Sequence, residues 1–153
     1  MKPPRAVFVA ATLAALGFAA ASQAQEYDAA LARQDWVLNC MGCHTANGSG
    51  IPGKVPPLRD SLGHFVSMPE GRQFVMSVPG ASNSALNDAE LANVLNWLLA
   101  TMNEKSRPAS FKPYTAEEIA AHRRPALTDV ARTRTKLVKQ LQENGVNAVP
   151  EHY

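Results

Sequence analysis

The stretch Cys40-Met41-Gly42-Cys43-His44 holds both cysteines of the 153-residue chain, two residues apart, with a histidine directly after the second. Paired thiols at this spacing can form a redox dithiol, part of a zinc site, a structural disulfide or a covalent haem attachment. A redox dithiol belongs in a βαβ context, which this sequence lacks. Zinc needs about two further Cys or His ligands at short spacing, which are also missing. A disulfide across two residues of one helical turn would be strained.

Haem attachment accounts for every residue type in the motif. Cys40 and Cys43 would form thioethers to the haem vinyl groups, and His44 would lie beneath the iron as its proximal ligand. The other interpretations leave His44 without a role. The sequence therefore predicts one covalent haem c, with its iron, held by Cys40, Cys43 and His44.

The N-terminal segment predicts export. Lys2 and Arg5 precede the uncharged run 6–21, and Ser22-Gln23-Ala24 places small residues where a signal peptidase recognises them. This order is typical of a secretory signal peptide, and the run is shorter than the roughly 20 residues that span a bilayer. We expect cleavage after Ala24 and a periplasmic chain without membrane contact. An uncleaved anchor is the alternative.

The charge distribution excludes a nucleic-acid binder and divides the chain. Fifteen Lys and Arg stand against thirteen Asp and Glu, which is too balanced for nucleic-acid binding through counterion release. Residues 25–100 hold seven acidic and four basic side chains, whereas residues 101–153 hold nine basic and six acidic ones. We expect a signal peptide over 1–24, a haem domain over 25–102, and a linker with a basic helical extension over 103–153.

Apolar spacing predicts helices on both sides of the motif. Residues 27–39 have a moderate amphipathic pattern, residues 45–60 form a Gly- and Pro-rich loop, and residues 70–77 can form a short helix. The strongest helix begins at Asp88, capped by Asn87 or Ser84. Its apolar face consists of Leu91, Val94, Leu95, Leu98 and Leu99. We expect this helix to pack across the helix that precedes the motif.

The extension also predicts two helices. Thr115 and Glu118 match a capping box for the first, and Thr128 and Gly145 mark the start and stop of the second. The final residues, 146–153, are expected to fray. The basic second helix either folds back on the acidic domain or serves as a docking arm for a partner protein.

Over residues 26–102 the chain resembles a class I c-type cytochrome. The resemblance rests on the motif 40–44, on Asn47-Gly48-Ser49-Gly50, on Pro56-Pro57-Leu58 and on the terminal stretch 86–98. It implies an all-α fold of three to five helices around one haem, with the first and last helices crossed. It also implies that a carbonyl near Pro56 or Pro57 accepts from the His44 Nδ1–H. The implied activity is electron transfer with a redox partner, such as a dehydrogenase or another carrier, rather than enzymatic catalysis.

The sixth iron ligand departs from the family pattern. Such cytochromes usually carry a distal Met, often followed by Pro, just before the last helix, but here Val78 precedes Pro79. Met76 is the first candidate, because its thioether is a soft ligand two residues upstream. The alternatives are Met68, His64 and, least favoured, Met102. An open site is the remaining alternative, and it would give a protein that binds CO or NO, or a peroxidatic haem protein.

Overall fold

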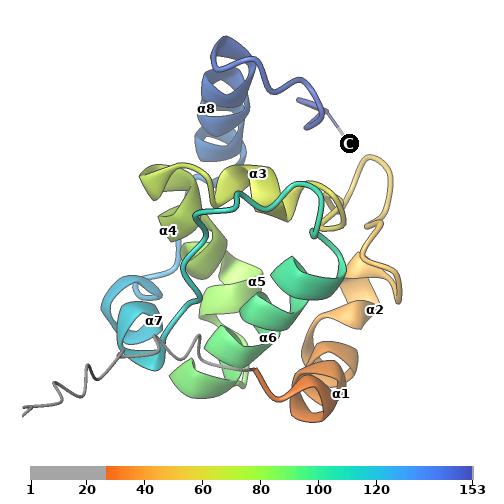
Figure 1. The fold of residues 1–153 in the computed structure, drawn as a ribbon, viewed down its shortest axis with the longest axis vertical. Helices are drawn as coiled ribbons and strands as arrows, with labels where there is room; N and C mark the ends of the chain where they lie inside the picture. The colour runs from red at the N-terminus through yellow and green to blue at the C-terminus, as the bar shows by residue number, and fades with distance from the viewer. Residues whose placement is uncertain (1–26, 153) are drawn as a thin grey trace, which may run out of the picture.

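Within residues 27–152, which the computed structural model describes, every regular element is a helix, apart from one isolated bridge between Ile51 and Val55. The predicted signal peptide lies outside these residues. The helices are α1 (Ala29–Asn39), α2 (Met41–His44), α3 (Leu62–Phe65), α4 (Pro69–Ser77), α5 (Pro79–Ser82), α6 (Asp88–Thr101), α7 (Ala116–His122) and α8 (Val130–Glu143). The all-α prediction is therefore confirmed (Figure 1).

The packing of α1 against α6 forms the centre of the fold. The Asp28 side chain caps α1 by accepting from the backbone N–H groups of Ala30 and Leu31, both at 3.0 Å. Ala32 and Trp36 are the buried apolar residues of α1. The buried apolar residues of α6 are Leu91, Ala92, Val94, Leu95, Leu98 and Leu99. The expected contact between the helix before the motif and the last helix of the haem domain is thus confirmed.

Six helices, rather than three to five, lie in the described part of the haem domain, residues 27–102. The longer ones, α1, α4 and α6, correspond to the predicted helices. The others, α2, α3 and α5, have four residues each. One turn is too short to show apolar periodicity, so only the folded chain reveals them. The loop over 45–60 contains no helix, as expected.

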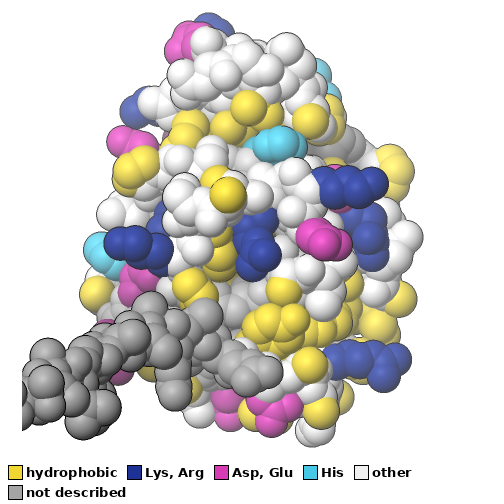
Figure 2. All heavy atoms as spheres, in the orientation of Figure 1, with side chains coloured by type: hydrophobic (Ala, Val, Ile, Leu, Met, Phe, Trp, Pro, Cys, Tyr) yellow, Lys and Arg dark blue, Asp and Glu magenta, His cyan; other side chains and the backbone are white. Residues whose placement is uncertain are grey.

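The C-terminal extension folds back onto the haem domain. Helix α7 packs on α6 and α4, and α8 packs on α4 and α3, at the opposite end of the molecule from α1 (Figure 1). Buried Leu137, Val138 and Leu141 form the apolar face of α8. On the face shown in Figure 2, basic and acidic side chains are interspersed. The fold-back alternative is therefore the one that the structure contains.

Two capping predictions in the extension need correction. The cap of α8 is Asp129, whose side chain accepts from the Arg132 N–H at 3.2 Å, and not Thr128. Thr115 does cap α7, but Glu118 does not complete the box, because its carboxylate pairs with Arg72 of α4. Long-range pairing thus replaces the local contact that the sequence suggested.

The segment after α8 is held in place up to residue 152, contrary to the expected fraying. Val149 is only 1% exposed. Arg134 of α8 is buried and donates to the carbonyls of Pro150 and Glu151, both at 2.8 Å. The arginine that interrupts the apolar pattern of α8 therefore fixes the chain end.

Among the described residues, none of the helices has the length and apolar character needed to cross a bilayer.

Replacing Asn87 with Ala tests the cap of α6. The Asn87 side chain accepts from the Glu90 N–H at 2.9 Å, and the Glu90 carboxylate accepts from the Asn87 N–H at 2.8 Å. We expect the free energy of unfolding in urea to fall by about 1 kcal/mol. Replacing the exposed Asn147 with Ala is the control and should change it by much less. Equal losses in the two variants would contradict the role of the cap.

Candidate functional site

The motif occupies the junction between α1 and α2. Cys40 ends α1 with its N–H bonded to the Trp36 carbonyl, and the N–H groups of Cys43 and His44 both donate to the Cys40 carbonyl. This short turn places two free thiols and an imidazole within one segment. Cys40 is half-buried, whereas Cys43 is exposed. The backbone therefore presents all three side chains of the motif from one rigid turn.

The His44 ring is oriented by a backbone carbonyl. Its Nδ1 lies 3.2 Å from the Pro56 oxygen, and because a carbonyl can only accept, Nδ1 carries the proton. Burial lowers the pKa of His44, and the bond to Pro56 partly opposes this effect. The neutral ring therefore keeps its lone pair on Nε2, which is the atom available to a metal.

The loop after the motif is folded so that Pro56 reaches His44. Gly50 donates to the His44 carbonyl at 3.0 Å, and Ile51 and Val55 exchange two backbone bonds that close the loop. Gly50 has φ +71°, and a Cβ there would collide with the Val55 carbonyl. A side chain at this position is therefore excluded by both strain and space. The Gly- and Pro-rich sequence thus builds the second contact of the imidazole.

Trp36 connects the motif to the core, a role that the sequence analysis did not assign. Its ring lies 6.3 Å from the ring centre of His44 and 6.3 Å from that of Trp97 in α6. It is 2% exposed, and its indole nitrogen has no hydrogen-bond partner among residues 27–152. The position one helical turn before Cys40 was the available signal, because residues four apart share a helix face.

The thiols are poorly suited to the competing metal and redox chemistries. Burial, and secondarily the charges of Asp35 and Cys43, raises the pKa of Cys40 to about 11. Zinc ligation and disulfide exchange need a thiolate, which this environment disfavours. Within residues 27–152, no three His, Cys, Asp or Glu side chains are grouped to hold a metal ion. The zinc interpretation therefore gains no support.

The candidate distal ligands lie in different places. Met76 is fully buried in α4, and Met68 is half-buried at the start of that helix. His64 of α3 and Met102, at the end of α6, both line an open groove of about 620 Å³ with Pro57. The Met102 sulfur would also lie 2.9 Å from a Cβ placed on Gly48. His64 and Met102 therefore face the loop that binds His44 Nδ1, whereas the α4 methionines do not line this groove.

Two curated proteins are similar to this chain. Cytochrome c-552 from Thermus thermophilus is 33% identical over 107 residues, covering 58% of this chain and 82% of the relative. A second cytochrome c-552, from another strain record of the same organism, has the same identity over the same length, covering 72% of that relative. No model of a protein family matches the chain.

The alignment also reveals a difference in length. The 107 aligned positions occupy 58% of this chain, which is about 89 of its 153 residues. About 18 positions of the relative therefore have no counterpart here. In this chain, only residues 78–87, including the single turn α5, connect α4 to α6.

Replacing His64 with Gln tests its environment through pH. Burial lowers the pKa of His64 below 6.5, and nearby Asp60 partly offsets the effect. As pH falls from 7 to 5, the unfolded chain binds a proton at this residue before the folded chain does, so folding loses stability. We expect the free energy of unfolding of the haem-loaded protein to fall more steeply in the wild type than in the variant. Equal slopes would contradict the proposed environment.

Proposed function

The chain belongs to the class I c-type cytochromes, and from this premise we propose that it carries electrons between redox partners through a haem c held by Cys40, Cys43 and His44. The protein is an electron carrier rather than an enzyme, and its cofactor is haem c with its iron. The observation that carries the residue assignment is the His44–Pro56 contact. It leaves Nε2 of a neutral imidazole available beside two free thiols.

The residues around the motif fit a bound haem. Thioether attachment requires two uncommitted thiols, and both cysteines are free. The partly buried apolar side chains against the core include Cys40, Met41 and Leu58, so the motif adjoins a surface that an apolar ring system can cover. When bound, haem c supplies one-electron iron chemistry whose potential depends on axial ligands, burial and hydrogen bonding. The protein's task is to fix the ring of His44 and exclude water.

Met76 is the distal ligand that we propose. The distal ligand must approach the iron from the side away from His44. His64 and Met102 share a groove with Pro57, next to the carbonyl that binds His44 Nδ1, so this arrangement favours the α4 methionines over both. Met76 is completely shielded from solvent, as a thioether ligand of a buried iron would be. Met68 is the alternative within the same helix.

The partner and the compartment follow from the same proposal. The N-terminal segment has the order of a signal peptide, and covalent haem attachment takes place after export, so we place the protein in the periplasm. A dehydrogenase or a respiratory carrier is the class of partner that exchanges single electrons there. The docking site for that partner would lie where the haem edge is exposed.

A second function is favoured by the short connection between α4 and α6. In the family the distal Met lies just before the last helix, and this chain lacks about 18 positions of its relative. If neither Met76 nor Met68 reaches the iron, the distal position is open. Such a protein would bind CO or NO, or react with peroxide, instead of acting only as a carrier.

Replacing the cysteines tests the attachment. We expect haem to stay with the wild-type chain after denaturation in acid and organic solvent. Cys40→Ser and Cys43→Ser should each retain one thioether, visible as a shift in the pyridine haemochrome spectrum, and the double variant should release all haem. Loss of haem from the denatured wild-type chain would overturn the proposal.

Optical spectra with and without CO separate the two functions. A carrier with Met76 bound should show a low-spin ferric spectrum, a Met–iron charge-transfer band and little reaction with CO. Met76→Ala should abolish that band, whereas Met68→Ala is the matched control and should retain it. A high-spin ferric spectrum and rapid CO binding in the wild type would instead support the open-site function.

A further inference from the structure

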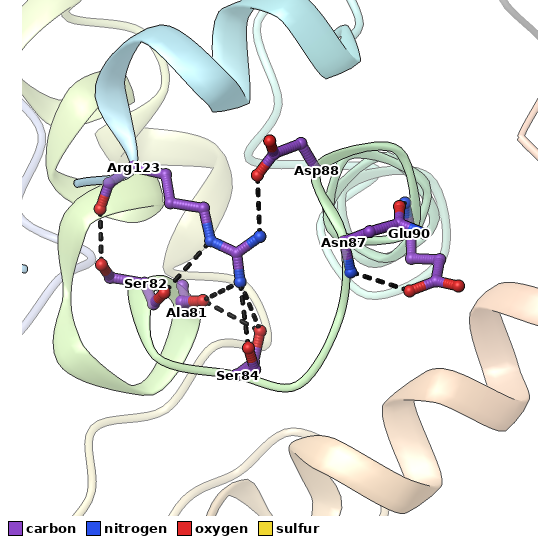
Figure 3. Close-up of polar contacts among 7 residues, drawn as sticks. All are labelled: Ala81, Ser82, Ser84, Asn87, Asp88, Glu90 and Arg123. Carbon is purple, nitrogen blue, oxygen red and sulfur yellow. Dashed lines mark hydrogen bonds and ion pairs between the residues drawn. The ribbon is translucent and has the colours of Figure 1, made fainter.

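Arg123 is a buried cation whose contacts lie almost entirely in the short connection between α4 and α6. It ends α7 and is 1% exposed. Its guanidinium donates to the carbonyls of Ser82 at 3.1 Å, Ala81 at 3.3 Å and Ser84 at 3.1 Å. It also donates to the Ser84 hydroxyl at 3.1 Å and to the Asp88 carboxylate at 2.8 Å. Figure 3 shows the guanidinium enclosed by these partners.

The contact runs in both directions along the backbone. The Ser82 hydroxyl donates to the Arg123 carbonyl, and the Leu127 N–H donates to the Ser77 carbonyl at 2.8 Å. The connection is thus attached to the extension at its start, at α5 and at the first residue of α6. Ser82 is fully buried, so water does not replace these bonds.

The connection contributes little to its own stability. Helix α5 has one turn, no side-chain cap and a proline at its start. Its last carbonyls therefore need external donors. Arginine meets this need because its planar group carries five donors in fixed directions and stays charged. Without Arg123, three backbone carbonyls in this shielded turn would lose their donor.

We propose that Arg123 is a positioning residue for the distal side of the haem, fixing the connection that replaces the longer ligand-bearing loop of the family. This inference rests on the proposed haem site. The extension then completes the haem domain by holding residues 77–88 in one conformation. The same constraint applies whether Met76 binds the iron or the distal position is open, because Val78 and α5 directly follow the end of α4.

Arg123→Met in the haem-loaded protein is the direct test. The uncharged side chain has a similar length but no donors, so the connection should lose its fixed conformation. We expect CO to bind the reduced variant about tenfold faster than the wild type, together with a shifted midpoint potential and an altered ferric spectrum. Arg123→Lys keeps the charge but not the fork of donors and should restore only part of the change.

Arg134→Met is the matched control. Arg134 is also a buried arginine of the extension that donates to two backbone carbonyls, but these belong to Pro150 and Glu151 in the tail. We expect it to lower the melting temperature without changing CO binding, potential or spectrum. If both variants lower the melting temperature and neither changes the haem properties, Arg123 has a structural role alone and the proposal is overturned. Equal changes of the haem properties in both would also overturn it.

A second pair of variants applies if Arg123→Met does not accumulate as folded protein. Asp88→Asn removes the ion pair, and Ser82→Ala removes the bond to the Arg123 carbonyl, while the guanidinium stays in place. Each should increase the CO binding rate by a smaller factor, and unchanged rates in both would refute the proposal. A wild-type chain that carries no covalent haem would instead refute the proposed function, so the two failures are distinguishable.

Discussion

The packing of Trp36 between α6 and the haem motif is the interaction on which the rest of the structure depends. The indole lies against Trp97 on one side and against the His44 ring on another. Because α1 leads directly into the motif, fixing α1 on α6 also fixes where the two thiols and the imidazole are presented. The loop over residues 45–60 then needs only to bring the Pro56 carbonyl to His44. A large buried aromatic is suited to this role because it combines burial with a defined ring geometry.

Local features of this fold could be predicted from the sequence, whereas contacts between distant segments could not. The helices over 70–77 and from Asp88, with the Asn87 cap, depend on neighbouring residues and were found as expected. The motif at 40–44 indicated its chemistry because residue type and spacing suffice for it. Glu118 was misassigned because Arg72 lies 46 residues away in sequence. The distal ligand is difficult for the same reason, since it depends on how α4 and the connection are placed relative to His44.

The extension illustrates how a charge count can mislead. Its excess of basic residues suggested a solvated cationic surface, yet Arg123 and Arg134 are buried and bind backbone carbonyls. Arg72, from α4, is used in the same way toward Lys112 and Pro113, and it also stacks over the Tyr114 ring at 4.0 Å. These arginines join segments that lack regular pairing with one another. The charge that a partner meets is therefore smaller than the composition of the extension indicates.

The contact between Ser82 and Arg123 joins residues 41 positions apart, and this separation has a kinetic consequence. Closing so long a loop costs chain entropy before the contact contributes any stability. Helix α7 is therefore expected to dock after α1 and α6 have paired, on the native side of the folding barrier. Interactions formed that late slow unfolding more than they accelerate folding. The extension would then act chiefly by prolonging the lifetime of the native state, a useful property for a protein that cannot be resynthesised where it works.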